Sequence, residues 1–194
     1  MQPPQHSQHA EDLMQIVAAS RWFMPALRTV RSLNLESWCI GAGAVRNLVW
    51  DHLHGYEEPS ALADIDVAYF DSHADPGQDQ EIQGILRALH LSNPWEVTNQ
   101  AHVHLWFTNY FGHSVEPLQS LEHAISTRPE FATSVGISLS PEDRIEITAP
   151  HGLEDLFAMR IRRNPTRVSL ETYSARILQK QYHKRWPQVS VVAS

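Results

Sequence analysis

Apolar residues recur every three or four positions in several parts of the chain, which is the spacing of a buried helix face. The segments with this spacing are 13–33, 45–53, 80–91, 152–161 and 170–186. Pro25 is expected to divide the first segment into two short helices, because proline disrupts a helix interior. Gly55 and Pro187 mark the expected ends of the second and last segments.

Other segments have the pattern of β-strands. A short apolar run covers 38–40, and residues 64–70 alternate between apolar and polar side chains. Apolar side chains occupy odd positions over 95–107, which predicts one long strand or two strands joined near Asn99. A hairpin is expected from 134–139 and 144–148. The order of these elements predicts an α+β fold with a mixed central sheet and flanking helices.

Length and composition favour a single domain over residues 11–194, with a basic helix near its C-terminal end. The chain has 194 residues, of which 42% are hydrophobic and 19% charged. A chain of this length and composition can bury a hydrophobic core without disulfides or a structural metal. No apolar run approaches the length of a membrane span, and residues 1–10 are polar and expected to be disordered. The single Cys39 excludes an internal disulfide and a cysteine-based zinc site, and a cytoplasmic location is expected.

The charge is distributed unevenly along the chain. The formal net charge is −7, which argues against a protein that coats nucleic acid. Residues 51–81 carry nine acidic side chains and no Lys or Arg, whereas 160–185 carry eight basic side chains and one Glu. Either the basic segment folds back on the acidic body, or it lines a groove for phosphates.

Asp64 and Asp66 form the first candidate for chemistry. Residues two apart on a strand point to the same face, so the two carboxylates are expected to lie close together. Their repulsion raises the pKa of each unless a cation intervenes, and Mg²⁺ binds carboxylate and phosphate oxygens. Taken alone, the pair is also compatible with two solvent-exposed aspartates at the start of a strand, or with aspartates that cap a turn.

The second candidate is the turn Gly41-Ala42-Gly43, which joins an apolar run to a predicted helix. A strand that enters a helix in this way presents free backbone N–H groups to a phosphate, although an ordinary tight turn has the same sequence. The turn precedes Asp64 by 21 residues. A phosphate site followed by a carboxylate pair suits a nucleoside triphosphate with its metal.

These residues resemble a known signature. The run from Ile40 through Leu48 to Gly55, followed by Asp64 to Val67, resembles the polymerase-beta-type nucleotidyltransferase superfamily. Its glycine turn and helix start are similar to those of the tRNA CCA-adding branch. Over residues 13–186, with blocks at 95–106 and 149–157, the chain resembles a family of small bacterial nucleotidyltransferase-like proteins of unassigned substrate.

The resemblance implies transfer of a nucleoside monophosphate from an NTP to a hydroxyl acceptor, with release of pyrophosphate. The implied catalytic and metal-binding residues, which would hold two Mg²⁺ ions, are Asp64, Asp66 and Glu96. The implied nucleotide-binding residues are Gly41, Ala42, Gly43, Arg46, Asn99 and Gln100. Ala42 stands where the superfamily usually has glycine, and Asn47 stands where the CCA-adding pattern has aspartate. The implied partners are the NTP and an acceptor that is a small molecule, a protein or an RNA end, with no membrane.

Several alternatives remain open at this stage. The fold could serve as a catalytically silent nucleotide-binding or interaction module. His102 and His104 would share a strand face with Glu96 and offer a zinc site for a hydrolase. A dinucleotide-binding interpretation of the glycine turn fails because Arg46 replaces the third glycine, and no Gly-Lys-Ser/Thr occurs for a P-loop. Cys39 is expected to be a buried thiol.

Overall fold

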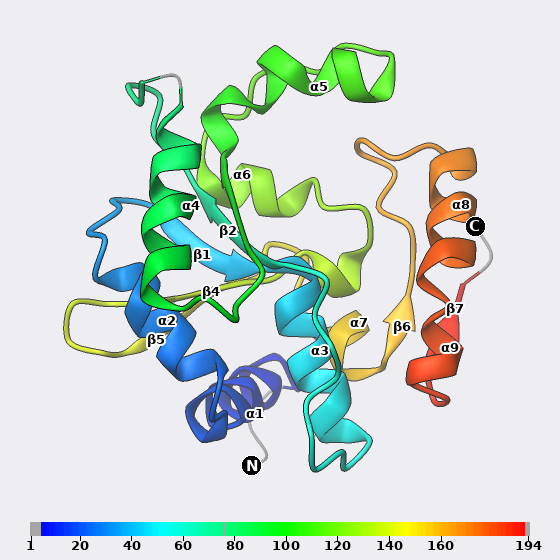
Figure 1. Ribbon diagram of the computed structural model, residues 1–194. Coiled ribbons are helices and arrows are strands. Elements are labelled where there is room, and N and C mark those ends of the chain that lie inside the picture. Colours follow the sequence, from blue (N-terminus) through cyan, green and yellow to red (C-terminus); the bar gives the residue numbers. More distant parts are fainter. Residues whose placement is uncertain (1–4, 76, 193–194) are drawn as a thin grey trace.

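A five-stranded sheet forms the centre of the molecule in the computed structural model, which describes residues 5–75 and 77–192, with side chains from residue 8 (Figure 1). Its strands are β1 (Trp38–Gly41), β2 (Ile65–Tyr69), β3 (Trp95–Asn99), β4 (Gly136–Leu139) and β5 (Ile145–Thr148), in the order β3-β2-β1-β4-β5. Strands β2 and β3 are parallel, and the other neighbouring pairs are antiparallel. The predicted mixed sheet with flanking helices is confirmed.

Helices surround this sheet, and a second, two-stranded sheet lies beside it. The longer helices are α1 (Gln5–Ala19), α2 (Phe23–Arg31), α3 (Ala42–Leu53), α4 (Gln78–Leu89), α5 (Val103–Phe111) and α8 (Leu170–Lys180). The shorter elements are η1 (Gln100–His102), α6 (Leu121–Ser126), η2 (Phe131–Thr133), α7 (Glu154–Phe157), β6 (Arg160–Ile161), α9 (Tyr182–Arg185) and β7 (Ser190–Val191). In the described ranges, no helix combines the length and the apolar character needed to cross a bilayer.

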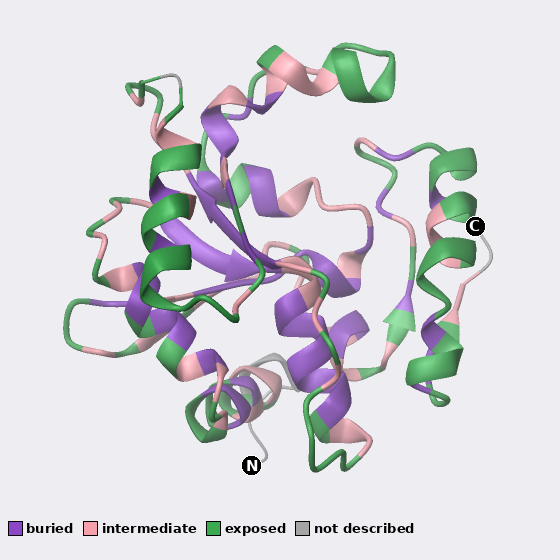
Figure 2. Cartoon of the chain, viewed as in Figure 1, coloured by how far each residue is buried: buried purple, intermediate pink, exposed green. Residues whose placement is uncertain are grey.

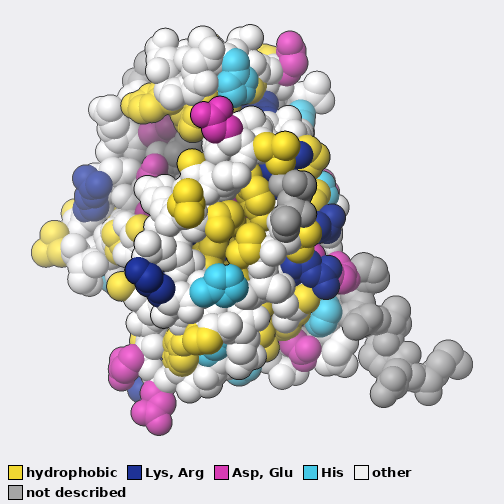
Figure 3. Space-filling view, turned by 90° about the vertical axis from the view of Figure 1, so that its right-hand side faces the viewer, with side chains coloured by type: hydrophobic (Ala, Val, Ile, Leu, Met, Phe, Trp, Pro, Cys, Tyr) yellow, Lys and Arg dark blue, Asp and Glu magenta, His cyan; other side chains and the backbone are white. Residues whose placement is uncertain are grey.

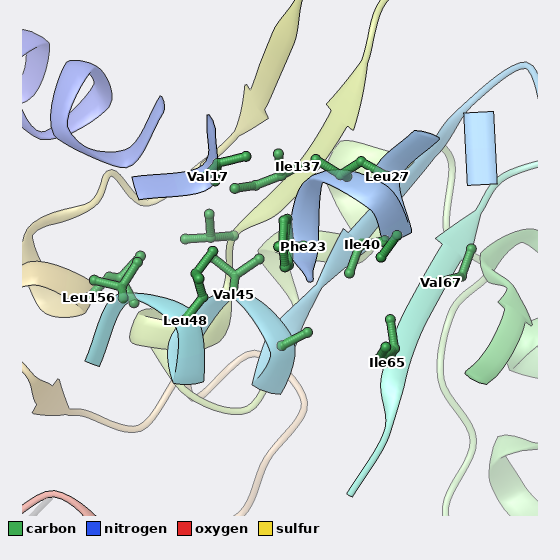
Figure 4. Packing of buried hydrophobic residues seen from close by; sticks show 14 of the residues in the cluster. Val17, Phe23, Leu27, Ile40, Val45, Leu48, Ile65, Val67, Ile137 and Leu156 are labelled. Atoms are coloured by element: carbon green, nitrogen blue, oxygen red, sulfur yellow. The ribbon is translucent and has the colours of Figure 1, made fainter. Parts of the chain in front are cut away.

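The main hydrophobic core lies against one face of the sheet. Alternate strand residues such as Ile40, Val67 and Ile137 point to this face and are fully buried. Figure 4 shows them meeting Phe23 and Leu27 of α2, with Val45 and Leu48 of α3 beside them. Purple, buried segments accordingly run through the sheet and α3 in Figure 2, whereas the outer surfaces of α4 and α8 are mostly exposed.

The opposite face of the sheet is covered by α6. Ile125 of α6 packs with Cys39 and Ala68. The strands carry glycine where α6 lies closest: a Cβ on Gly136 would stand 2.5 Å from Sγ of Cys39 and 3.5 Å from Cδ1 of Ile125. Glycine at this position therefore allows α6 to pack closely against this face of the sheet.

Part of the basic C-terminal segment is paired with acidic side chains outside residues 51–81. Arg176 of α8 binds Glu130, and Arg162 binds Asp155. The face that carries α8 shows Lys and Arg dispersed among hydrophobic, histidine and acidic side chains (Figure 3). The basic segment therefore supplies internal ion pairs as well as surface charge.

Two expectations about the N-terminal helices are wrong. Helices α1 and α2 are separated at residues 20–22, and Pro25 lies in the first turn of α2, where its missing N–H removes no helical hydrogen bond. The expected disorder of residues 1–10 also fails for residues 5–10, which belong to α1. Residues 1–4 lie outside the described residues.

The predicted strand over 95–107 ends at Asn99. The Asn99 side chain accepts a hydrogen bond from the N–H of Ala101, which caps η1 and turns the chain into α5. The alternating pattern beyond this point arises on a helical segment. The helix predicted over 152–161 is confined to α7, and the helix predicted over 170–186 is interrupted at Gln181, whose φ is 46°.

We predict that Gly136→Ala destabilises the protein by about 1–3 kcal/mol, because the added methyl group overlaps Cys39 in a packed layer. The matched control is Gly84→Ala on the exposed side of α4, where a Cβ meets nothing within 4 Å. That change is expected to stabilise the protein by roughly 0.5–1 kcal/mol, because alanine favours helix. Urea unfolding measures both, and a stable Gly136→Ala protein would contradict the packing described here.

Candidate active site

An acidic row crosses the sheet at the end of β1 where α3 begins. Asp66 of β2 pairs directly with Glu96 of the parallel strand β3, so both side chains point to the same face. On the other side of β2, the antiparallel register pairs Ile40 with Val67, which places Gly41 next to Asp66. Gly41 is also the residue before α3, so the carboxylates lie beside that helix's N-terminus.

Asp64 adds a third carboxylate to this row. It stands two residues before Asp66 and thus on the same side of the chain, and it is partly exposed, whereas Asp66 is buried. Burial raises the pKa of Glu96, and the charges of Asp64 and Asp66 raise it further. The structure thereby brings together all three acidic residues that the sequence singles out.

Arg128 lies directly on this acidic row, in the loop after α6. Its Nη2 is 2.6 Å from Oδ2 of Asp66, and both side chains are mostly buried. The Arg128 charge also works against the upward shift in the pKa of Glu96. Nothing in the sequence pattern identified Arg128, which is separated from Asp66 by more than 60 residues.

The residues of the acidic row can be compared with the ligands that a magnesium ion requires. Three carboxylates on one face are the hard oxygen ligands that Mg²⁺ prefers. Yet within residues 5–75 and 77–192 no three His, Cys, Asp or Glu side chains are already arranged around a common metal position. The donor chemistry fits magnesium, and the Arg128 guanidinium serves as the cation beside Asp66.

The glycine turn forms the start of α3. Gly41 ends β1 in an extended conformation, and Ala42 adopts φ 51° and donates its N–H to the carbonyl of Val135. A left-handed conformation is costly for alanine, so local strain is stored here. At Gly43 a Cβ would meet only Nη2 of Arg46 within 4 Å. A side chain would thus fit at Gly43, and the phosphate site expected at the first turn of α3 remains a prediction.

Arg46 points from α3 into an aromatic cage. Its guanidinium carbon lies 5.1–5.5 Å from the ring centroids of Trp50, Tyr182 and Trp186. Its Nη2 donates to Oδ1 of Asn47 at 2.7 Å. Burial is the main cause of a lowered pKa for Arg46. These contacts give Arg46 a packing role that joins α3 to α9, and its nucleotide-binding role remains a prediction.

Asn99 and Gln100 do not lie on the acidic row. Asn99 is at the far end of β3 and is buried, with its side chain bonded to both the N–H and the carbonyl of Asp71. Gln100 begins η1 and donates to the carbonyl of Thr98. Asn99 shares β3 with Glu96 and Gln100 lies beyond the end of that strand, and the nucleotide-binding role of both remains a prediction.

The end of β3 at Asn99 also affects the two histidines. His102 belongs to η1 and His104 to α5, so neither shares a strand face with Glu96. The zinc interpretation loses its geometric basis. Cys39 is buried, and burial raises its pKa to about 12, which leaves it as the neutral thiol that the sequence suggests.

A buried ion pair, Glu130 with Arg176, holds α8 near the site. Glu130 is fully buried and accepts hydrogen bonds from Nε of Arg176 at 2.9 Å and from the Thr133 hydroxyl at 3.1 Å. Burial lowers the pKa of Arg176, but the hydrogen bond and charge of Glu130, with a contribution from Asp64, raise it above the ordinary value. The excess of basic residues over 160–185 was the only signal in the sequence for this contact.

Comparison with known proteins places these features in context. The family model described as Nucleotidyltransferase matches residues 28–191. A solved structure titled "The NMR structure of the protein reveals a CCA-adding enzyme head domain" has a TM-score of 0.78 and 26% sequence identity, and the match covers 95% of this chain and 96% of that one. The search of curated proteins found no relative.

Two larger structures share the fold at lower identity. They are titled "Structure of tRNA-processing enzyme complex 3" (TM-score 0.53, 19% identity, 86% of this chain and 42% of that one) and "tRNA-processing enzyme (apo form I)" (TM-score 0.50, 17% identity, 99% and 45%). The present chain spans less than half the length of either protein.

Replacement of Asp64 by Asn is expected to lower the pKa of the Glu96 carboxyl, because one of the charges that raise it is removed. Replacement of Arg128 by Gln is expected to raise the same pKa further. Carboxyl ¹³C NMR titration of Glu96 measures both directions. An unchanged Glu96 titration in both variants would show that the three carboxylates and Arg128 do not share one site.

Loss of the Glu130 charge should weaken the attachment of α8. We predict that Glu130→Gln destabilises the protein by about 3 kcal/mol, because a buried ion pair is broken. Glu142→Gln breaks the exposed pair with Arg144 and should cost less than about 1 kcal/mol. Equal effects in thermal or urea unfolding would argue against a structural role for Glu130.

Proposed function

The chain belongs to the nucleotidyltransferase family, and we propose that it moves a nucleoside monophosphate from an NTP to a hydroxyl acceptor in a magnesium-dependent reaction. The observation that supports this most directly is the acidic row of Asp64, Asp66 and Glu96 beside the N-terminus of α3. Carboxylates next to a phosphate-binding helix start suit a triphosphate with its metal.

Asp64, Asp66 and Glu96 are the side chains that would hold the two Mg²⁺ ions. When bound, magnesium neutralises charge on the triphosphate and stabilises in-line displacement at phosphorus. Asp66 is the central ligand in this proposal, since it lies between Glu96 on β3 and Gly41 on β1. Its contact with Arg128 must open before it can take this role.

The chain's own groups account for binding and proton transfer. In this proposal the N–H groups of the first turn of α3, at Gly43, bind the β- and γ-phosphates. Glu96, whose pKa is raised by burial and by its acidic neighbours, accepts the proton of the acceptor hydroxyl. The hydroxyl oxygen forms a bond to the α-phosphorus. The bond between the α-phosphorus and the oxygen that bridges to the β-phosphorus breaks, and pyrophosphate leaves with the electron pair of that bond.

The acceptor belongs to one of the three classes implied by the sequence: a small molecule, a protein side chain or an RNA end. Structural likeness to proteins titled as tRNA-processing enzymes favours testing RNA first. The cytoplasmic location expected from the sequence is retained as part of this proposal.

One observation favours a second candidate, a catalytically silent nucleotide-binding or interaction module. The ion pair between Arg128 and Asp66 already neutralises the central carboxylate without a metal. If that pair is permanent, the acidic row serves the fold and no metal-dependent chemistry follows. The two candidates differ in whether an NTP loses pyrophosphate in the presence of Mg²⁺.

The decisive experiment uses each NTP labelled at either the α- or the γ-phosphate, with RNA, protein and small-molecule extracts as acceptors. Transfer predicts that the α-label is retained on an acceptor and that the γ-label leaves as pyrophosphate. Binding of NTP without release of pyrophosphate would instead support the silent module. Release of inorganic phosphate alone would contradict both.

Asp66→Asn is expected to reduce Mg²⁺-dependent pyrophosphate release by at least about 100-fold, because the central ligand loses its charge. The matched control is Asp75→Asn, which changes an exposed aspartate in the loop before α4 and should leave the rate unchanged. Circular dichroism establishes that both variants are folded. A folded Asp66→Asn protein with full activity would contradict the proposed role of the acidic row.

A further inference from the structure

The loop after α6 places a positive charge on the acidic row and next to the start of α3. Ile125 of α6 is close to both Gly41 and Gly136, since a Cβ on either glycine would lie within 3.8 Å of its Cδ1. Three residues later, the Arg128 guanidinium contacts Asp66 at 2.6 Å. Gly41, the residue before α3, therefore lies on the α6 side of the sheet, as Arg128 does.

The contact between Arg128 and Asp66 leaves one donor of the guanidinium without a partner. Nη2 of Arg128 contacts Oδ2 of Asp66 at 2.6 Å, whereas Nε is buried and has no hydrogen-bond partner in the described part of the chain. Arg176 by contrast directs both Nε and Nη2 at Glu130. Guanidinium groups bind carboxylates and phosphates best with two parallel N–H donors. Arg128 thus has unused capacity for a second anionic partner.

A divalent cation and the Arg128 guanidinium compete for the same carboxylate. Both are positive, and a cation bound to Oδ2 of Asp66 would occupy the position that Nη2 now holds. Asp66 becomes a metal ligand only after Arg128 moves away, and a polyphosphate beside α3 offers the displaced guanidinium a new anionic partner.

We propose that Arg128 exchanges partners during the reaction cycle, binding Asp66 when no nucleotide is present and the polyphosphate of the nucleotide when it is bound. This inference rests on the proposed function and adds a positioning residue to it. Arg128 then has two effects of opposite sign: it weakens the binding of a divalent cation to the empty site, and it strengthens the binding of polyphosphate.

Separate titrations of the full chain with Mn²⁺ alone and with tripolyphosphate in EDTA test the two effects, without metal–phosphate complexes in solution. Arg128→Gln is expected to tighten Mn²⁺ binding at least about tenfold, because the competing charge is removed, and to weaken tripolyphosphate binding by at least about tenfold. Isothermal titration calorimetry and Mn²⁺ electron paramagnetic resonance give the two dissociation constants.

Asp66→Asn provides the sharper test, because it releases Arg128 from its partner. Tripolyphosphate is expected to bind Asp66→Asn more tightly than wild type, and this gain should vanish in the double variant Asp66→Asn/Arg128→Gln. Asp64→Asn removes a neighbouring charge without freeing Arg128 and should have the smaller effect. Arg144→Gln, which loses an exposed arginine paired with Glu142, should leave both dissociation constants unchanged.

Equal Mn²⁺ affinity in wild type and Arg128→Gln would overturn the exchange of partners, as would an Asp66→Asn gain that persists without Arg128. If Arg128→Gln does not fold, Arg128→Lys is the second variant, because it keeps the charge without the two parallel donors. Arg128→Lys should bind Mn²⁺ as wild type does and tripolyphosphate more weakly than wild type. Pyrophosphate release by wild type is read separately. The proposed function therefore survives if Mn²⁺ binds but Arg128 has no influence, and both ideas fail if no variant binds Mn²⁺ and no pyrophosphate is released.

Discussion

Repulsion among three carboxylates on one face of the sheet is the constraint on which the site depends. Asp64, Asp66 and Glu96 are brought together by the pairing of two strands, and the pKa of Glu96 is raised first by burial and then by the charges of Asp64 and Asp66. A folded chain accommodates such a group either by protonation of one carboxylate or with a compensating cation. In this structure Arg128 provides that charge. A divalent ion with its triphosphate would provide it during the proposed reaction, so one electrostatic requirement links stability to function.

The geometry of the sheet explains why these particular residues meet. Strands β2 and β3 are parallel, and the connection through α4 returns the chain to the same edge, so the early residues of both strands lie side by side. The antiparallel strand β1 ends where β2 begins, which brings Gly41 and the start of α3 to the same place. Glycine at positions 41 and 136 allows α6 to approach closely and carry Arg128 over the row. Backbone pairing and one close packing contact thus position the whole site.

The sequence predicted the parts of the site that depend on local pattern. The structure confirms three features that follow from residues close in sequence. These are the strand of alternating apolar and polar residues around Asp66, the glycine turn at Gly41, and the hairpin of β4 and β5. The pattern misled beyond Asn99, because alternating apolar residues also fit a short helix once the Asn99 side chain caps η1. Arg128 was missed for a different reason. Its position follows from the packing of α6 on the sheet, and no spacing along the chain encodes that contact.

Arg128 also changes how a retained set of acidic residues should be interpreted. Carboxylates that persist at a metal site are usually taken as a sign of catalysis, yet here their charge is balanced within the chain itself. A permanent ion pair and an exchangeable one differ in how completely the guanidinium is hydrogen-bonded. A guanidinium with an unused donor is a weaker partner for Asp66 than the forked contact that Arg176 makes with Glu130. Arg176 directs two donors at Glu130, whereas the Nε of Arg128 has no hydrogen-bond partner in the described part of the chain. The incomplete pairing of Arg128 therefore favours an ion pair that forms and breaks over one that only supports the fold.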